Sequence, residues 1–184
     1  DFLSRSSKLQ RLQELLDELL KTGDRAILFT QFAEWGHLLQ AYLQQKFSEE
    51  IPFLYGATSK KNRQQMIDKF QEDPRGPKIF LLSLKAGGVG LNLTRASHVF
   101  HIDRWWNPAV ENQATDRAYR IGQAKTVMVH KFITKGSIEE KIDAMIKKKF
   151  QLSQELIGSN EDWLGEIDIE NLKKLVSLEE DKES

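Results

Sequence analysis

The residue types best suited to chemistry gather in two segments that could bind phosphate groups. The first, SLKAGGVGLNLT at residues 83–94, directly follows a short apolar run. Its glycines permit positive φ angles and let backbone amides approach a ligand closely. Lys85 and the hydroxyls of Ser83 and Thr94 would suit a phosphate. A glycine-rich segment is as often only a tight turn, so both interpretations stay open for this segment alone.

The second segment is WNPAVENQATDRAYRIGQ at residues 106–123. Pro108 suits the first position of a helix and Gly122 suits its end. Three polar side chains at spacing i, i+4, i+7 would share one face of this helix: Gln113, Arg117 and Arg120. Two guanidinium groups and an amide that point the same way can hold a polyanion such as a triphosphate.

The alternative interpretation of this helix is a solvated charged face, with Arg117 paired to Glu111 or Asp116. Helical charge spacing alone favours that alternative. Two well-known phosphate-binding motifs are missing: GxxxxGK[ST] does not occur, and the third glycine of a dinucleotide-binding turn is absent. His98 and His101 would point to opposite faces of a strand, so we do not expect them to share a metal.

Short apolar runs must position these segments. Five runs predict buried strands, at residues 25–32, 51–56, 78–84, 98–103 and 126–133. They are continuously apolar, as is typical of parallel strands covered on both faces. Helical patterns separate several of them, which indicates right-handed βαβ units. The sequence therefore predicts an α/β fold: a doubly wound, mainly parallel sheet with helices on both faces.

Helical periodicity places the remaining core. A leucine stripe predicts a helix over residues 7–22, ended by Gly23. A second predicted helix begins at Ala33 and turns five side chains inward: Trp35, Leu38, Leu39, Tyr42 and Leu43. Either Thr58 or Ser59 could cap a third, whose apolar face is Met66, Ile67 and Phe70. From Ser137 the chain is helical and then acidic, so we expect a lobe over residues 1–147 and a helical extension over 148–184.

Composition bounds the class of protein. The 184 residues carry 27 Lys plus Arg and 27 Asp plus Glu, and this balance argues against a uniformly basic nucleic-acid-binding surface. The chain has no Cys, which excludes disulfides and thiolate sites. No apolar run reaches the roughly 20 residues needed to cross a bilayer. The chain starts at Asp1 without a signal peptide, so we expect a fragment of a longer intracellular protein.

Taken together and in order, the motifs closely resemble the C-terminal RecA-like lobe of Swi/Snf-type ATPases. These are double-stranded DNA translocases of helicase superfamily two, and the resemblance is to bacterial or archaeal members. It covers residues 6–150. Five stretches carry it: ILFTQF, LYGATSKKNRQQMIDKF, LLSLKAGGVGLNLT, DRWWNP and QATDRAYRIGQ. The last is the most specific, because QxxDRxxRIGQ separates this family from the DEAD-box RNA helicases.

The resemblance implies half of a two-lobe motor. It implies that Arg117 and Arg120 reach the phosphates of ATP, that Gln113 helps to organise the cleft, and that Gly88 and Gly90 lie near the nucleotide. ATP and Mg²⁺ would be bound mostly by the N-terminal lobe, which carries the P-loop. The isolated chain is therefore expected to be inactive as an ATPase.

The resemblance also implies a track for the backbone of double-stranded DNA. Its residues in this sequence would be Gln31, Thr58, Arg63, Ser83 and Lys85. The expected partners are duplex DNA and the N-terminal lobe, with no membrane, and the isolated chain would be monomeric. The expected location is the cytoplasm and nucleoid in a prokaryote or the nucleus in a eukaryote. The helix over residues 138–150 resembles the family's brace.

Two alternatives remain from the sequence. One is an RNA helicase lobe, against which QxxDRxxRIGQ and DRWWNP argue. The other is a noncatalytic nucleic-acid-binding scaffold, against which the presence of both arginines argues. Remodelling of chromatin or other protein–DNA complexes, repair, and recycling of RNA polymerase are tasks that the sequence does not separate.

Overall fold

The computed structural model describes residues 6–83, 91, 93–103, 108–116 and 126–156. The chain divides into two compact units. The first comprises residues 1–103 and 112–132, and the second comprises residues 104–111 and 133–184.

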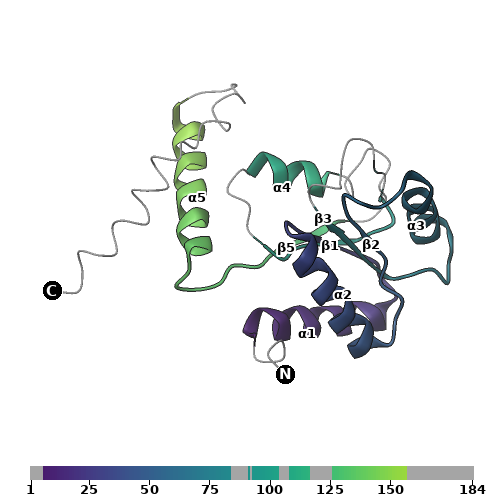
Figure 1. Cartoon of the computed structure of the whole chain (residues 1–184). Helices are drawn as coiled ribbons and strands as arrows, with labels where there is room; N and C mark the ends of the chain where they lie inside the picture. Colours follow the sequence, from purple (N-terminus) through teal and green to yellow (C-terminus); the bar gives the residue numbers. More distant parts are fainter. Residues whose placement is uncertain (1–5, 84–90, 92, 104–107, 117–125, 157–184) are drawn as a thin grey trace. The chain divides into compact units, whose positions relative to one another are not determined.

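The first unit is built on a parallel sheet (Figure 1). Among the described residues five strands lie in the order β2-β3-β1-β4-β5, and each neighbouring pair is parallel. Their bounds are β1 Ala26–Thr30, β2 Phe53–Leu54, β3 Ile79–Ser83, β4 His98–His101 and β5 Met128–Lys131. This order, in which the chain leaves β1 for one side of the sheet and later crosses to the other, confirms the predicted doubly wound α/β fold.

The helices are α1 Ser7–Thr22, α2 Ala33–Phe47, α3 Lys60–Glu72, α4 Pro108–Thr115 and α5 Ile138–Leu156. The predicted carboxyl end of α1 is confirmed: the helix is followed by Gly23, which adopts a left-handed conformation with φ 77°. Of the two candidate caps for α3, the structure selects Ser59, whose hydroxyl oxygen accepts a hydrogen bond from the Asn62 amide at 3.3 Å. Serine suits this position because it satisfies an amide that the helix cannot pair.

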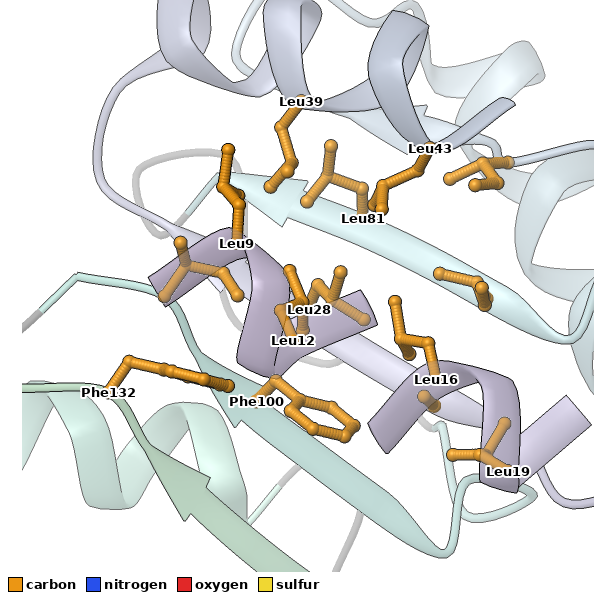
Figure 2. Close-up of a cluster of buried hydrophobic side chains, with 14 of the residues drawn as sticks. Leu9, Leu12, Leu16, Leu19, Leu28, Leu39, Leu43, Leu81, Phe100 and Phe132 are labelled. Carbon is orange, nitrogen blue, oxygen red and sulfur yellow. The ribbon is translucent and has the colours of Figure 1, made fainter. Parts of the chain in front are cut away.

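Side chains of successive strand residues alternate between two cores. On one face Leu28 and its neighbours pack against the leucine stripe of α1 and against Leu39 and Leu43 of α2 (Figure 2). On the other face Ile27 and Phe29 pack with Phe70 of α3. Because helices cover both faces of β1, β3 and β4, these strands are almost fully buried, as their continuous apolar sequences predict.

Three sequence predictions need correction. Leu38 does not face inward; 57 % of it is exposed. The fifth strand is not covered on both faces, because β5 is the edge strand and leaves Met128 52 % and Val129 41 % exposed. Helix α4 ends at Thr115 and Asp116 forms a turn, so the predicted helix does not run unbroken through Asp116; its predicted end at Gly122 lies outside the described residues.

The second unit contains α5. Its first turn is held by its own carboxylates: Glu139 accepts a hydrogen bond from the Thr134 amide at 3.0 Å and Glu140 from the Gly136 amide at 2.7 Å. Acidic side chains in this position also suit the positive end of the helix dipole. The helix continues across residue 147, where we expected the lobe to end, and the division into lobe and extension stays a prediction.

Candidate functional site at the carboxyl edge of the sheet

Three strands of the sheet end in polar residues at one edge. Thr30 ends β1 and Ser83 ends β3, and these two residues are register partners. Asp103 follows β4 by two residues. Because parallel strands present their carboxyl ends at the same edge, the segments predicted to bind phosphate start from one place, as ligand sites of doubly wound sheets do.

Asp103 connects β4 to β1. Its Oδ2 accepts a hydrogen bond from the Thr30 hydroxyl at 2.6 Å and another from the Gln31 amide at 3.1 Å. Hydrogen bonds to a carboxylate are stronger than neutral ones, so this contact fixes the backbone where Gln31 leaves the strand. Gln31, a predicted DNA contact, is partly exposed, whereas Ser83 is buried.

Two further predicted contacts lie between β2 and α3. The Thr58 hydroxyl accepts a hydrogen bond from the Tyr55 amide at 3.0 Å, and the Thr58 amide donates to the Tyr55 carbonyl at 2.9 Å, which closes the turn before α3. Arg63 stands in the first turn of α3, where its amide donates to the Ser59 carbonyl. The Arg63 Nε is buried and has no hydrogen-bond partner among the described residues.

The carboxyl end of α3 forms hydrogen bonds with Arg25, which precedes β1, and with Thr94, which ends the glycine-rich segment. The sequence analysis did not predict these contacts. The Arg25 guanidinium donates to the Phe70 carbonyl and, at 2.6 Å, to the Asp73 carbonyl. Burial, followed by the charge of Arg95, lowers the pKa of Arg25, and the Asp73 carboxylate opposes that shift. Gln71 donates to the Thr94 hydroxyl at 3.3 Å. The last residue of the glycine-rich segment is thus tied to the helix that carries Arg63.

His101, at the end of β4, was also missed as a contact residue. Its Nε2 lies 2.9 Å from the Thr115 hydroxyl at the end of α4, and its ring stacks on Phe29 with centroids 5.5 Å apart. The sequence signal was available, because Thr115 belongs to the arginine-containing motif and His101 closes a strand. The expectation that His98 and His101 face opposite sides is confirmed, since His98 instead approaches His130.

The remaining predicted site residues are described only in part. Gln113 lies on α4 and is exposed. Lys85, Gly88, Gly90, Arg117 and Arg120 lie outside the described residues. No cluster of three or more His, Cys, Asp or Glu side chains that could hold a metal ion occurs in the described part of the chain. In the same part, no helix is long and apolar enough to cross a bilayer.

Residues 7–122 match the helicase conserved C-terminal domain family, which is more than half of the chain. The chain belongs to this family. A putative ATP-dependent helicase/translocase, YwqA of Bacillus subtilis, is 48 % identical over 95 % of this chain and 18 % of its own length. The chain thus spans about a fifth of the length of the curated relatives it matches.

Solved structures place the chain within this family more narrowly. The Sulfolobus solfataricus SWI2/SNF2 ATPase core in complex with double-stranded DNA is 44 % identical, with a TM-score of 0.71 over 94 % of this chain and 36 % of that one. The C-terminal domain of the same ATPase is 42 % identical, with a TM-score of 0.67 over 94 % of this chain and 69 % of that one. The predicted resemblance to a Swi/Snf-type C-terminal RecA-like lobe is confirmed.

Proposed function

We propose that this helicase C-terminal domain is the second motor lobe of an ATP-dependent double-stranded DNA translocase. The observation that carries the proposal is the carboxyl edge. There Asp103, which opens the DRWWNP motif, holds Thr30 and Gln31 of the ILFTQF motif, and the arginine motif is bonded to the same strand through Thr115. The similar SWI2/SNF2 core that was solved with double-stranded DNA supports duplex DNA as the partner.

The proposed role of the chain toward ATP is to supply cations to its phosphates. Arg117 and Arg120 would hold the phosphates when the lobes close, with Gln113 beside them and with Gly88 and Gly90 near the nucleotide. This donor set fits a triphosphate, since guanidinium and amide groups bind phosphate oxygens. Mg²⁺ would be held by the N-terminal lobe. When bound, ATP supplies the phosphoryl group whose negative charge shifts during hydrolysis, and arginines delivered at that moment stabilise the transition state.

The proposed DNA track consists of Gln31, Thr58, Arg63, Ser83 and Lys85. Hydroxyls, amides and cations bind phosphates without reading bases, as a protein that moves along any sequence requires. Gln31, Thr58 and Arg63 are partly exposed and could meet a phosphate directly. Ser83 is only 2 % exposed, so its part in the track depends on the residues that follow it.

The experiment that tests the motor proposal uses a protein with both lobes. Arg117→Ala and Arg120→Ala should each lower single-turnover ATP hydrolysis by about 10³- to 10⁵-fold, the usual contribution of an arginine finger. Equilibrium ATP binding should change far less, because the other lobe makes most contacts. Lys should not restore either rate, because an ammonium lacks the planar fork of arginine. Arg11→Ala is the matched control, since Arg11 is exposed and, in the described part of the chain, its ion pair is with Glu14.

The isolated chain provides the complementary test. It should unfold cooperatively, hydrolyse ATP negligibly, and bind duplex DNA weakly, without sequence preference and with steep salt dependence. Arg63→Ala should weaken binding to all sequences alike. Robust DNA-stimulated hydrolysis by this chain alone, or stimulation of the two-lobe protein by duplex RNA rather than duplex DNA, would contradict the proposal.

A further inference from the structure

We propose that His101 is a positioning residue for Arg117, acting through the hydroxyl of Thr115. This inference rests on the proposed function, because it assigns a role to His101 only if Arg117 acts on the phosphates of ATP. The structure shows a buried histidine and its hydrogen bond to the end of α4, and the sequence places the arginine two residues later.

The histidine is fixed by its surroundings. His101 is 1 % exposed, and its ring stacks on Phe29 at an interplanar angle of 19°. Its backbone is paired as well: His101 is the register partner of Phe29, and the amide of Ile102 donates to the Phe29 carbonyl at 3.0 Å. The imidazole is therefore packed closely against the sheet and can serve as a reference point for a neighbouring element.

The partner of this histidine is the last residue of α4. His101 Nε2 and Thr115 Oγ1 lie 2.9 Å apart. Beside it, Ala114 is 2 % exposed in the core shared with α3, and the Asp116 amide donates to the Asn112 carbonyl at 2.8 Å. One apolar contact and one side-chain hydrogen bond thus locate the end of α4 on the sheet. The hydrogen bond also fixes the rotation of the helix end, which packing of an alanine alone does not specify.

Arg117 follows this anchor by two residues. Backbone bond lengths limit how far the arginine can depart from a fixed Thr115. Catalytic groups must be held within about 0.5 Å of their productive geometry, and a misplacement of about 1 Å can cost on the order of 100-fold in rate. Loss of the hydrogen bond should therefore slow the chemical step more than it weakens ATP binding.

The same strand end also contacts Gln31, one residue of the predicted DNA track. Two residues after His101, Asp103 accepts hydrogen bonds from Thr30 and from the Gln31 amide. His101 and Asp103 together thus attach the arginine motif and the first DNA contact to one strand.

The test compares conservative variants in the two-lobe protein. Thr115→Val keeps the shape and removes the hydroxyl, and it should lower the single-turnover rate about 10- to 100-fold with ATP affinity nearly unchanged. Thr115→Ser restores the hydroxyl and should stay within a few-fold of the wild-type rate. His101→Phe keeps the stacking on Phe29 but has no ring nitrogen, so it should match Thr115→Val. The double variant should be no slower than either single one.

A control separates positioning from stability. Thr22→Val removes a threonine hydroxyl of α1 that donates to the Leu19 carbonyl at 2.9 Å, so it makes the same chemical change away from the carboxyl edge. It should lower the melting temperature slightly and leave the rate unchanged. If His101→Phe does not fold, the comparison of Thr115→Val with Thr115→Ser decides the question alone.

The outcomes separate this inference from the function on which it rests. If Arg117→Ala itself turns over normally, the arginine-finger part of the proposed function is overturned. If Arg117→Ala is inactive but Thr115→Val is as fast as wild type, the positioning role of His101 is overturned. Equal losses in Thr115→Val and Thr115→Ser would also overturn it, because they would show that packing rather than the hydroxyl matters.

Discussion

The two sides of strand β4 use the same residue type for different purposes. On the side of α1, His98 Nδ1 lies 3.2 Å from His130 Nε2, and the stacked rings continue through Phe100 to Phe132. On the opposite side, His101 makes a hydrogen bond to Thr115 of another element. The first histidine helps β5 to pair with β4 at the edge of the sheet, whereas the second relates a helix end to the sheet.

This difference extends to the regions around the two histidines. The core below α1 and α2 is apolar, and its leucines determine how much surface folding removes from water. The carboxyl edge instead contains hydroxyls, a carboxylate and an imidazole that bond one another. We therefore expect changes in the first region to alter stability and changes in the second to alter geometry and rate.

The largest effect on stability is expected in the apolar region. Leu16 lies on the buried face of α1 and is 0 % exposed, so Leu16→Ala should lower the free energy of unfolding by about 2–5 kcal/mol. Leu38→Ala is the matched control, because Leu38 is 57 % exposed and its loss should cost less than about 0.5 kcal/mol. Urea denaturation of the 184-residue chain measures both. Similar losses in the two variants would contradict the assignment of α1 to the core.

A smaller loss is expected at the carboxyl edge. Asp103→Ala leaves the Thr30 hydroxyl and the Gln31 amide without this acceptor, and it should cost about 1–3 kcal/mol. Asp103→Asn keeps one acceptor oxygen and should lose less. Urea denaturation and DNA affinity should both be measured. If the two regions differ as argued, Asp103→Ala also weakens DNA binding, whereas Leu16→Ala leaves the binding of the folded chain unchanged.

The fold was predictable because each strand is a continuous apolar run. The runs at residues 25–32 and 78–84 contain β1 and β3, and helices cover both of their faces. The same pattern failed for β5, because an apolar sequence does not tell a central strand from an edge strand. Periodicity likewise placed Leu38 inside, because it lies next to Leu39, which is buried. Leu38 falls just outside the stripe of α2 that the core covers, and periodicity does not give the width of that stripe.

The site was predictable only as motifs. Gln31 and Arg63 could be located from their motifs, but the contacts among motifs depend on the order of the strands in the sheet. The sequence alone does not specify that order. Asp103 reaches Thr30 because β4 pairs with β1, although 73 residues separate them. The bond of His101 to Thr115 likewise depends on where Thr115 lies against β4, which helix periodicity does not specify.

The N-terminal cap of α3 lies at the carboxyl edge and should contribute less stability than Asp103. Ser59→Ala removes the hydroxyl that accepts from the Asn62 amide, and it should cost about 1 kcal/mol. Because Arg63 lies in the same first turn, the variant should also weaken DNA binding somewhat. Ser59→Asp keeps the cap and should retain stability, as thermal unfolding can measure. Equal stability of Ser59→Ala and wild type would show that this cap does not hold the turn.

The smallest effect is expected from the histidine pair and depends on pH. Burial is the main cause that lowers the pKa of His98 and of His130 from the ordinary 6.5; Asp24 opposes the shift at His98, while His98 and Arg11 add to it at His130. Well above pH 6.5, both histidines are neutral in the folded and unfolded chain. Below pH 6.5, the unfolded chain takes up protons that the folded pair resists, so stability falls until the lowered folded pKa is reached.

The melting temperature of the 184-residue chain should therefore drop between pH 7.5 and about 5.5, and that of the double variant His98→Phe, His130→Phe should drop less. If the melting temperature of that variant changes with pH as much as that of the wild type, His98 and His130 do not cause the pH dependence.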